Sequence, residues 1–142
     1  MTLEVGFPCY NAVHRMGANA GDTVVLVNPE EVIQIMGSVP EGQVTTITEV
    51  CRAIAEKHDV AACCTLTTGI FIMTVANACA EAKGELEHLP YWRTLKADGF
   101  LNEKFPDGQE GHREKLEAEG FSVIRRGKRY QVEELDERLF RP

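Results

Sequence analysis

The sequence lacks the cysteine and histidine spacings on which most disulfide frameworks and zinc sites depend. Its five cysteines are an odd number without a CxxC pair, and its four histidines contain no HExxH pair. These absences argue against a disulfide-stapled domain, a structural zinc site and a zinc protease. We therefore expect no metal and no other cofactor, and we expect most of the thiols to be reduced and packed.

Long hydrophobic runs are also missing. The most apolar stretch, residues 70–76, is far too short to span a bilayer. The first residues do not show the basic-then-apolar layout of a secretion signal. The length of 142 residues and the charged fraction of 26% suit one soluble domain. We expect a cytoplasmic protein that does not contact membranes.

Positive charge is scarce in the first half of the chain. The net charge is −7, and only Arg15, Arg52 and Lys57 are basic before residue 83. Uniformly spread, this charge would repel nucleic acid, because attraction to phosphates is the main source of non-specific affinity. Any anion-binding face should therefore use the twelve Lys and Arg residues that lie at or after position 83.

Local patterns predict a mainly helical α+β chain. A winged domain over residues 29–142 follows an N-terminal extension, 1–28, that contains a short strand at 23–27. Asn28 with Pro29, and Thr46 with Glu49, are helix-start signals. Helices are predicted over 29–37, 47–57, 70–82, 110–119 and 133–140. Residues 93–95 and 100–101 are predicted to pair across Asp98-Gly99, and 121–132 to form a hairpin.

Three helices with a small hairpin are the make-up of a winged helix-turn-helix DNA-binding domain with short hairpins. The predicted helices over 47–57 and 70–82 would form the helix-turn-helix pair. The first two turns of the second one are apolar nearly all round, which predicts burial.

Several segments, in order, resemble one family. Residues 39–50, Val-Pro-Glu-Gly-Gln-Val-Thr-Thr-Ile-Thr-Glu-Val, resemble the start of the helix-turn-helix of the alkylguanine-DNA alkyltransferases (methylated-DNA–protein-cysteine methyltransferases). Residues 90–94, Pro-Tyr-Trp-Arg-Thr, fall where that family carries Pro-Cys-His-Arg-Val. Asp98-Gly99 and residues 116–120 fit its downstream pattern. The resemblance spans roughly residues 29–132.

The resemblance implies DNA repair, in which a flipped alkylguanine gives its alkyl group to a cysteine thiolate. Here Tyr91 stands in place of the cysteine and Trp92 in place of the histidine. A phenol with a pKa of about 10 is a poor nucleophile at neutral pH, and an indole is not a base. The chain is therefore similar to the alkyltransferase-like branch, which binds the damaged base without transferring the alkyl group. We expect it not to be an enzyme of the family type.

The resemblance also implies the site residues. The expected lesion pocket consists of Tyr91, Trp92, Arg93, Ile47 and Glu119. The expected DNA-binding residues are Thr46, Thr68, Thr74, Asn77, Arg125, Arg126, Lys128 and Arg129. The expected partners are double-stranded DNA, with or without an alkylated guanine, and a repair-pathway protein.

Other interpretations stay open. Tyr91 and Trp92 are also typical of a core plug, and the cations at 125–129 of a solvated hairpin tip. Ile47 stands where the family has a nucleotide-rotating tyrosine, and no basic residue lies near Thr74, where the family has an arginine. These departures favour an alternative, a degenerate winged-helix scaffold that binds a protein or small molecule instead of DNA. A third hypothesis is a thiol enzyme that uses one of three cysteines, Cys63, Cys64 or Cys79.

Overall fold

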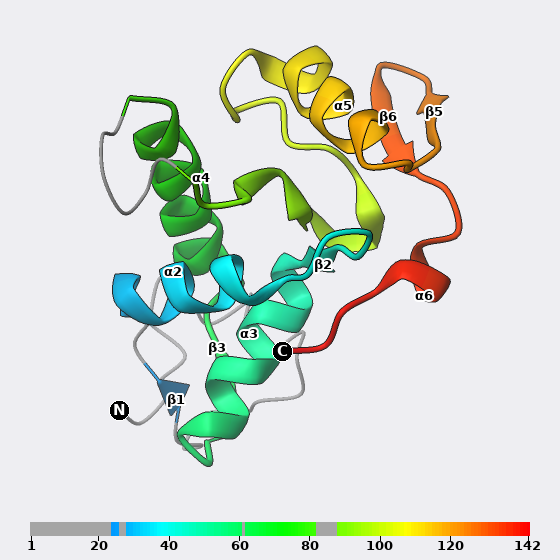
Figure 1. The fold of residues 1–142 in the computed structure, drawn as a ribbon. Coiled ribbons are helices and arrows are strands. Elements are labelled where there is room, and N and C mark those ends of the chain that lie inside the picture. Colours follow the sequence, from blue (N-terminus) through cyan, green and yellow to red (C-terminus); the bar gives the residue numbers. More distant parts are fainter. Residues whose placement is uncertain (1–23, 26–27, 61, 82–87) are drawn as a thin grey trace.

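The computed structural model describes residues 24–25, 28–60, 62–81 and 88–142 (Figure 1). The helices are α2 (Pro29–Ser38), α3 (Ile47–Lys57), α4 (Thr65–Glu81), α5 (Gly108–Ala118) and α6 (Leu135–Arg138), with 3-10 turns η1 (Tyr91–Arg93) and η2 (Ala97–Gly99). The strands are β1 (Val24–Val25), β2 (Thr45–Thr46), β3 (Ala62–Cys63), β4 (Thr94–Leu95), β5 (Val123–Arg126) and β6 (Arg129–Val132). The mainly helical α+β class is confirmed. Most of the proposed N-terminal extension lies outside the described residues.

The first two helices begin where their capping residues predict. The Asn28 side-chain oxygen accepts a hydrogen bond from the Glu30 amide at 2.9 Å, and the Thr46 hydroxyl accepts one from the Glu49 amide at 3.3 Å. Each bond satisfies an amide that the first turn leaves without a partner. The Glu49 carboxylate instead accepts a bond from Arg52 at 2.7 Å, so only half of the predicted capping box is observed.

The predicted start of α4 is wrong by five residues, because the helix begins at Thr65 and not at residue 70. The Cys64 sulfur accepts a hydrogen bond from the Thr67 amide at 3.4 Å and so occupies the position of a cap. Cysteine is not among the residues that predict a helix start. Two other predicted bounds also differ, since α5 begins at residue 108 and α6 covers only four residues.

The hairpin β5–β6 is confirmed, but the hairpin predicted across Asp98-Gly99 is wrong. Strand β4 pairs in parallel with β2, matching Thr45 with Thr94, and Phe100 forms an isolated bridge with Gln131 of β6. Asp98 and Gly99 both have positive φ, at 63° and 83°, within a tight 3-10 turn. After this turn the Leu101 amide donates to the Tyr130 carbonyl of β6, and the segment does not continue as a partner strand of β4.

Two clusters of buried side chains form the core. The first cluster lies between α2, α3 and α4, and the second lies under α5 and the β5–β6 hairpin. Trp92 of η1 packs against both clusters, and Figure 1 shows the η1 segment running between the three helices and the α5 side. Position 92 therefore joins the two halves of the fold. None of the helices described here is long and apolar enough to cross a membrane.

Candidate nucleic-acid interface

The expected lesion pocket centres on η1, which is a short turn between the two core clusters. Pro90 precedes the turn, and its carbonyl accepts a hydrogen bond from the Arg93 amide at 3.1 Å. This turn directs Tyr91 into the first cluster and leaves Trp92 half-buried between the clusters. Consecutive side chains therefore reach different environments.

A buried carboxylate ties η1 to the end of α5. Glu119 accepts hydrogen bonds from the Trp92 indole N–H and from Arg93 Nε, the latter at 2.9 Å. Arg93 Nη1 donates to the Val39 carbonyl at 2.9 Å. The Arg93 and Glu119 side chains are only 15% and 9% exposed. Three of the five expected pocket residues are thus brought together, and all three are hydrogen-bonded to one another or to the backbone. Charge-assisted bonds of this kind are among the stronger ones.

Tyr91 is packed as a core residue. It is 9% exposed and meets Trp92 and Phe105 edge-to-face, with ring centroids 5.3 Å and 5.7 Å apart. Burial, and then the nearby Asp107 and Cys79, raise the pKa of the phenol. Tyr91 is therefore a neutral phenol at physiological pH, and its geometry fits the plug interpretation.

The fifth expected pocket residue, Ile47, lies at the start of α3 against α4. A methyl group placed on Gly69 of α4 would come within 2.9 Å of the Ile47 side chain. Ile47 also packs against the first core cluster. These contacts show that Ile47 packs α3 closely against α4.

His112 is a positioning residue that the sequence did not identify. It is fully buried, its Nδ1 accepts a bond from the Asn102 amide at 3.1 Å, and its Nε2 donates to the Trp92 carbonyl at 2.8 Å. Burial lowers the pKa of His112 to about 4, although the Trp92 carbonyl acts in the opposite direction. The neutral ring fixes the backbone of η1. Its spacing of four residues from the buried Leu116 on one helix face is a signal that could have revealed it.

The indole of Trp92 is partly covered by cations. Lys115 Nζ lies 5.0 Å from the centroid of the ring, and Arg93 Cζ lies 5.8 Å from it. Cations at these distances are attracted to the ring. Lys115 and Arg93 therefore lie against part of the indole ring.

Two of the DNA contacts expected from the sequence lie in the interior. Thr68 is fully buried and bonded to the Cys63 sulfur at 3.4 Å, and Thr46 is 5% exposed and caps α3. The Thr68 hydroxyl bonds to a buried sulfur and the Thr46 hydroxyl caps α3, so both are used inside the fold, and contact of these two residues with DNA stays a prediction. Thr74 and Asn77 are exposed, but Thr74 donates to the Ile70 carbonyl at 2.8 Å and Asn77 donates to two other carbonyls.

The exposed face of α4 is apolar at its N-terminal half. Leu66 and Ile70 are 57% and 51% exposed. The burial predicted for residues 70–76 is therefore wrong for Ile70, whereas Ile72, Val75 and Ala76 are buried. The sequence has no charged residue from position 60 to position 80. This face therefore carries neither the carboxylates that repel phosphates nor the cations that attract them.

The four expected cations of the hairpin are all exposed. Arg125 donates to the Gly127 carbonyl at 2.9 Å, and Arg126 donates to the Gln131 side chain at 3.2 Å. Arg129 Cζ lies 4.0 Å from the centroid of the Phe100 ring. Figure 1 shows the hairpin and α4 on opposite sides of the molecule. The hairpin cations and the apolar helix face are thus two separate surfaces.

The cysteines of the third hypothesis are buried. Cys63, Cys64 and Cys79 are 0%, 7% and 7% exposed. Hydrogen bonding from Cys51 lowers the pKa of Cys63, whereas burial raises that of Cys79. All three cysteines are therefore buried, and a thiol enzyme would need at least one of them to be accessible to its substrate. Among the residues that the structure describes, no group of three or more His, Cys, Asp or Glu side chains could hold a metal ion.

Comparison with known proteins shows a likeness of fold to two solved chains. No protein-family model matches the sequence, and no curated protein does. Two solved structures resemble it, each with a TM-score of 0.58 and covering 80% of this chain and 94% of the other. They are the S. pombe ATL protein in complex with DNA, 17% identical, and S. pombe Atl1 in complex with damaged DNA containing O6-carboxymethylguanine, 18% identical. The likeness confirms the resemblance inferred from the sequence as a likeness of fold.

Proposed function

We propose that the protein binds double-stranded DNA and recognises an altered guanine without transferring its alkyl group. The observation that carries this proposal is the fold, which covers 94% of two chains that were solved in complex with DNA. In helix-turn-helix proteins, including the winged-helix ones, the second helix of the pair lies in a groove of the DNA. That helix is α4 here, and its outer face is free of carboxylates up to Glu81.

The chemistry of α4 favours an apolar contact with the groove. Leu66 and Ile70 protrude from it, while Thr74 and Asn77 are already bonded to backbone carbonyls. Apolar side chains inserted between base steps unstack and kink DNA in many minor-groove proteins. Ile70, one turn into the exposed face, is the side chain that we expect to act in this way.

The residues at positions 91 and 92 support binding without alkyl transfer. The buried phenol of Tyr91 has a raised pKa, and the Trp92 N–H is bonded to Glu119. Neither group supplies a thiolate or a base. Trp92 is half-buried whereas Tyr91 is buried, so Trp92 is the member of this pair that we expect to contact a base.

Fluorescence anisotropy with two duplexes tests the proposal, one of which contains O6-methylguanine. We expect tighter binding to the modified duplex, and we expect Ile70→Asp to weaken binding to both by about tenfold, roughly 1.4 kcal/mol. Gln34→Asp is a matched control, because it adds the same charge to an exposed position of α2. Failure to bind either duplex at low salt overturns the proposal. A methylated protein in the intact mass spectrum would disprove the absence of transfer.

The exposed apolar face of α4 also favours a second candidate. A winged-helix scaffold that has lost DNA binding would use Leu66 and Ile70 to bind a protein, since exposed apolar patches often mark protein interfaces. The net charge of −7 agrees with this candidate. The anisotropy experiment separates the two, because only the DNA-binding candidate predicts that Ile70→Asp changes the affinity for a duplex.

A further inference from the structure

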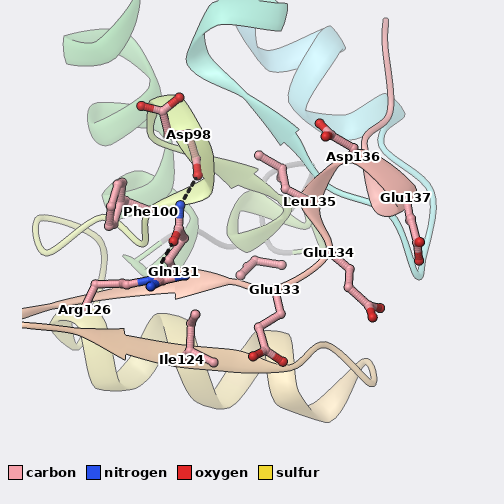
Figure 2. A pocket seen from close by; sticks show the side chains of 11 residues that line it. Asp98, Phe100, Ile124, Arg126, Gln131, Glu133, Glu134, Leu135, Asp136 and Glu137 are labelled. Carbon is pink, nitrogen blue, oxygen red and sulfur yellow. Dashed lines mark hydrogen bonds between the residues drawn. The ribbon is translucent and has the colours of Figure 1, made fainter.

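An open groove of about 890 Å³ lies between η2, the β5–β6 hairpin and α6 (Figure 2). Figure 2 shows Asp98 and Phe100 on one side of it and Glu134, Asp136 and Glu137 on the other. None of the expected lesion-pocket residues lines this groove. It is therefore a second surface, separate from η1 and α4.

The lining of the groove combines apolar and acidic side chains. Its apolar members are Phe100, Ile124, Val132 and Leu135. Its acidic members are Asp98, Glu133, Glu134, Asp136 and Glu137. All five carboxylates are exposed, whereas the four apolar residues are buried or half-buried. The groove thus has an apolar floor and an acidic rim.

The rim carboxylates have no ion-pair partner among the residues that the structure describes. One cation, Arg126, also lines the groove, and it donates to Gln131, while Arg129 stacks on Phe100. Gln131 in turn donates to the Asp98 carbonyl at 2.7 Å, which holds η2 against β6 (Figure 2). The negative charge of the rim is therefore available to a partner.

We propose that this groove binds a basic segment of another protein, with an apolar side chain on the floor and Lys or Arg side chains on the rim. Charge complementarity decides the class of occupant, because unpaired carboxylates repel the phosphates of nucleic acid and attract cations. A segment of alternating basic and apolar residues satisfies both layers of the groove at once. The acidic surplus of the whole chain would also steer such a partner toward the protein.

A fluorescein-labelled peptide of twelve residues, alternating lysine and leucine, serves as the probe. The groove variant removes three rim charges: Glu133→Gln, Asp136→Asn and Glu137→Gln. The matched control removes three exposed carboxylates elsewhere: Glu30→Gln, Glu56→Gln and Glu114→Gln. Both variants have the same net charge. We expect about tenfold weaker binding for the groove variant and less than about twofold for the control, as rim charges act locally. Equal losses in the two variants overturn the proposal.

A second arm tests the apolar floor. We expect Ile124→Ala to weaken the lysine–leucine peptide about threefold or more, because a buried apolar contact is lost. A peptide in which serine replaces every leucine should bind the wild type and Ile124→Ala equally. Amide chemical shifts in a titration with the first peptide should change at Gln131, Glu134 and Leu135. Shift changes confined to other regions, or an Ile124→Ala affinity equal to that of the wild type, overturn the proposal.

Discussion

Buried His112 makes the stability of the protein sensitive to mild acid. Its pKa falls from 6.5 to about 4 because burial disfavours the charged ring. The lowered pKa means that the unfolded chain binds a proton between these two values and the folded chain does not. The contribution of His112 to stability is therefore complete above pH 6.5 and is lost as the pH falls towards 4.

The size of the effect follows from the pKa difference. One pKa unit corresponds to about 1.4 kcal/mol, so the whole difference corresponds to about 3 kcal/mol. Between pH 7 and pH 5 the expected loss is roughly 2 kcal/mol, a window in which most carboxylates have not yet titrated. Urea unfolding followed by circular dichroism at several pH values in this window measures the loss.

The variant His112→Gln isolates the contribution of this one group. Glutamine cannot titrate, but it can still donate to the Trp92 carbonyl that His112 Nε2 contacts at 2.8 Å. We expect the variant to be less stable at pH 7 by about 1–3 kcal/mol and nearly independent of pH between 7 and 5. If the wild type and the variant lose the same stability on acidification, the conclusion that His112 is a buried neutral ring is wrong.

Individual buried side chains and one helical glycine lead to three more predictions. Glu119→Ala should lower the free energy of unfolding by about 3 kcal/mol, because it leaves the buried Arg93 guanidinium without its carboxylate. The control Glu117→Ala, at an exposed position of α5, should lower it by less than about 1 kcal/mol. Similar losses in the two variants would contradict this prediction. Gly111→Ala should destabilise by about 1–3 kcal/mol in urea, despite the better helix propensity of alanine, because its methyl group would lie 2.8 Å from the Pro106 carbonyl. The four described cysteines should react with an aromatic disulfide reagent only after denaturation, in a Cys9→Ser background; fast native labelling of any of them would refute their burial.

Local signals account for the parts of the fold that the sequence predicted. Asn28 and Thr46 cap their helices because a side-chain oxygen next to a free amide needs no distant partner. The β5–β6 hairpin likewise depends on one turn, at Gly127 with a φ of 65°. Such features can be predicted from a few neighbouring residues.

Non-local pairing accounts for most of what was missed. The β2–β4 pair joins Thr45 to Thr94, and the alternation of either segment alone does not specify a parallel partner so far along the chain. The sulfur cap at Cys64 replaces an oxygen cap, so the usual signal for the start of α4 is absent. The exposed groove between η2 and α6 depends on both the bridge from Phe100 to β6 and the short α6.

The hydrogen bonds of Glu119 show how the buried carboxylate is satisfied next to Tyr91 and Trp92. By the resemblance, this carboxylate belongs to a site with a histidine to orient, and here it has none. A buried carboxylate without a partner would be costly, and the Trp92 N–H together with Arg93 supplies the missing donors. These two donors satisfy the buried carboxylate without a histidine. The hydrogen bond to Glu119 also holds the Trp92 ring, which is half-buried. Under the proposed function, this arrangement would let the protein contact an altered base without transferring its alkyl group.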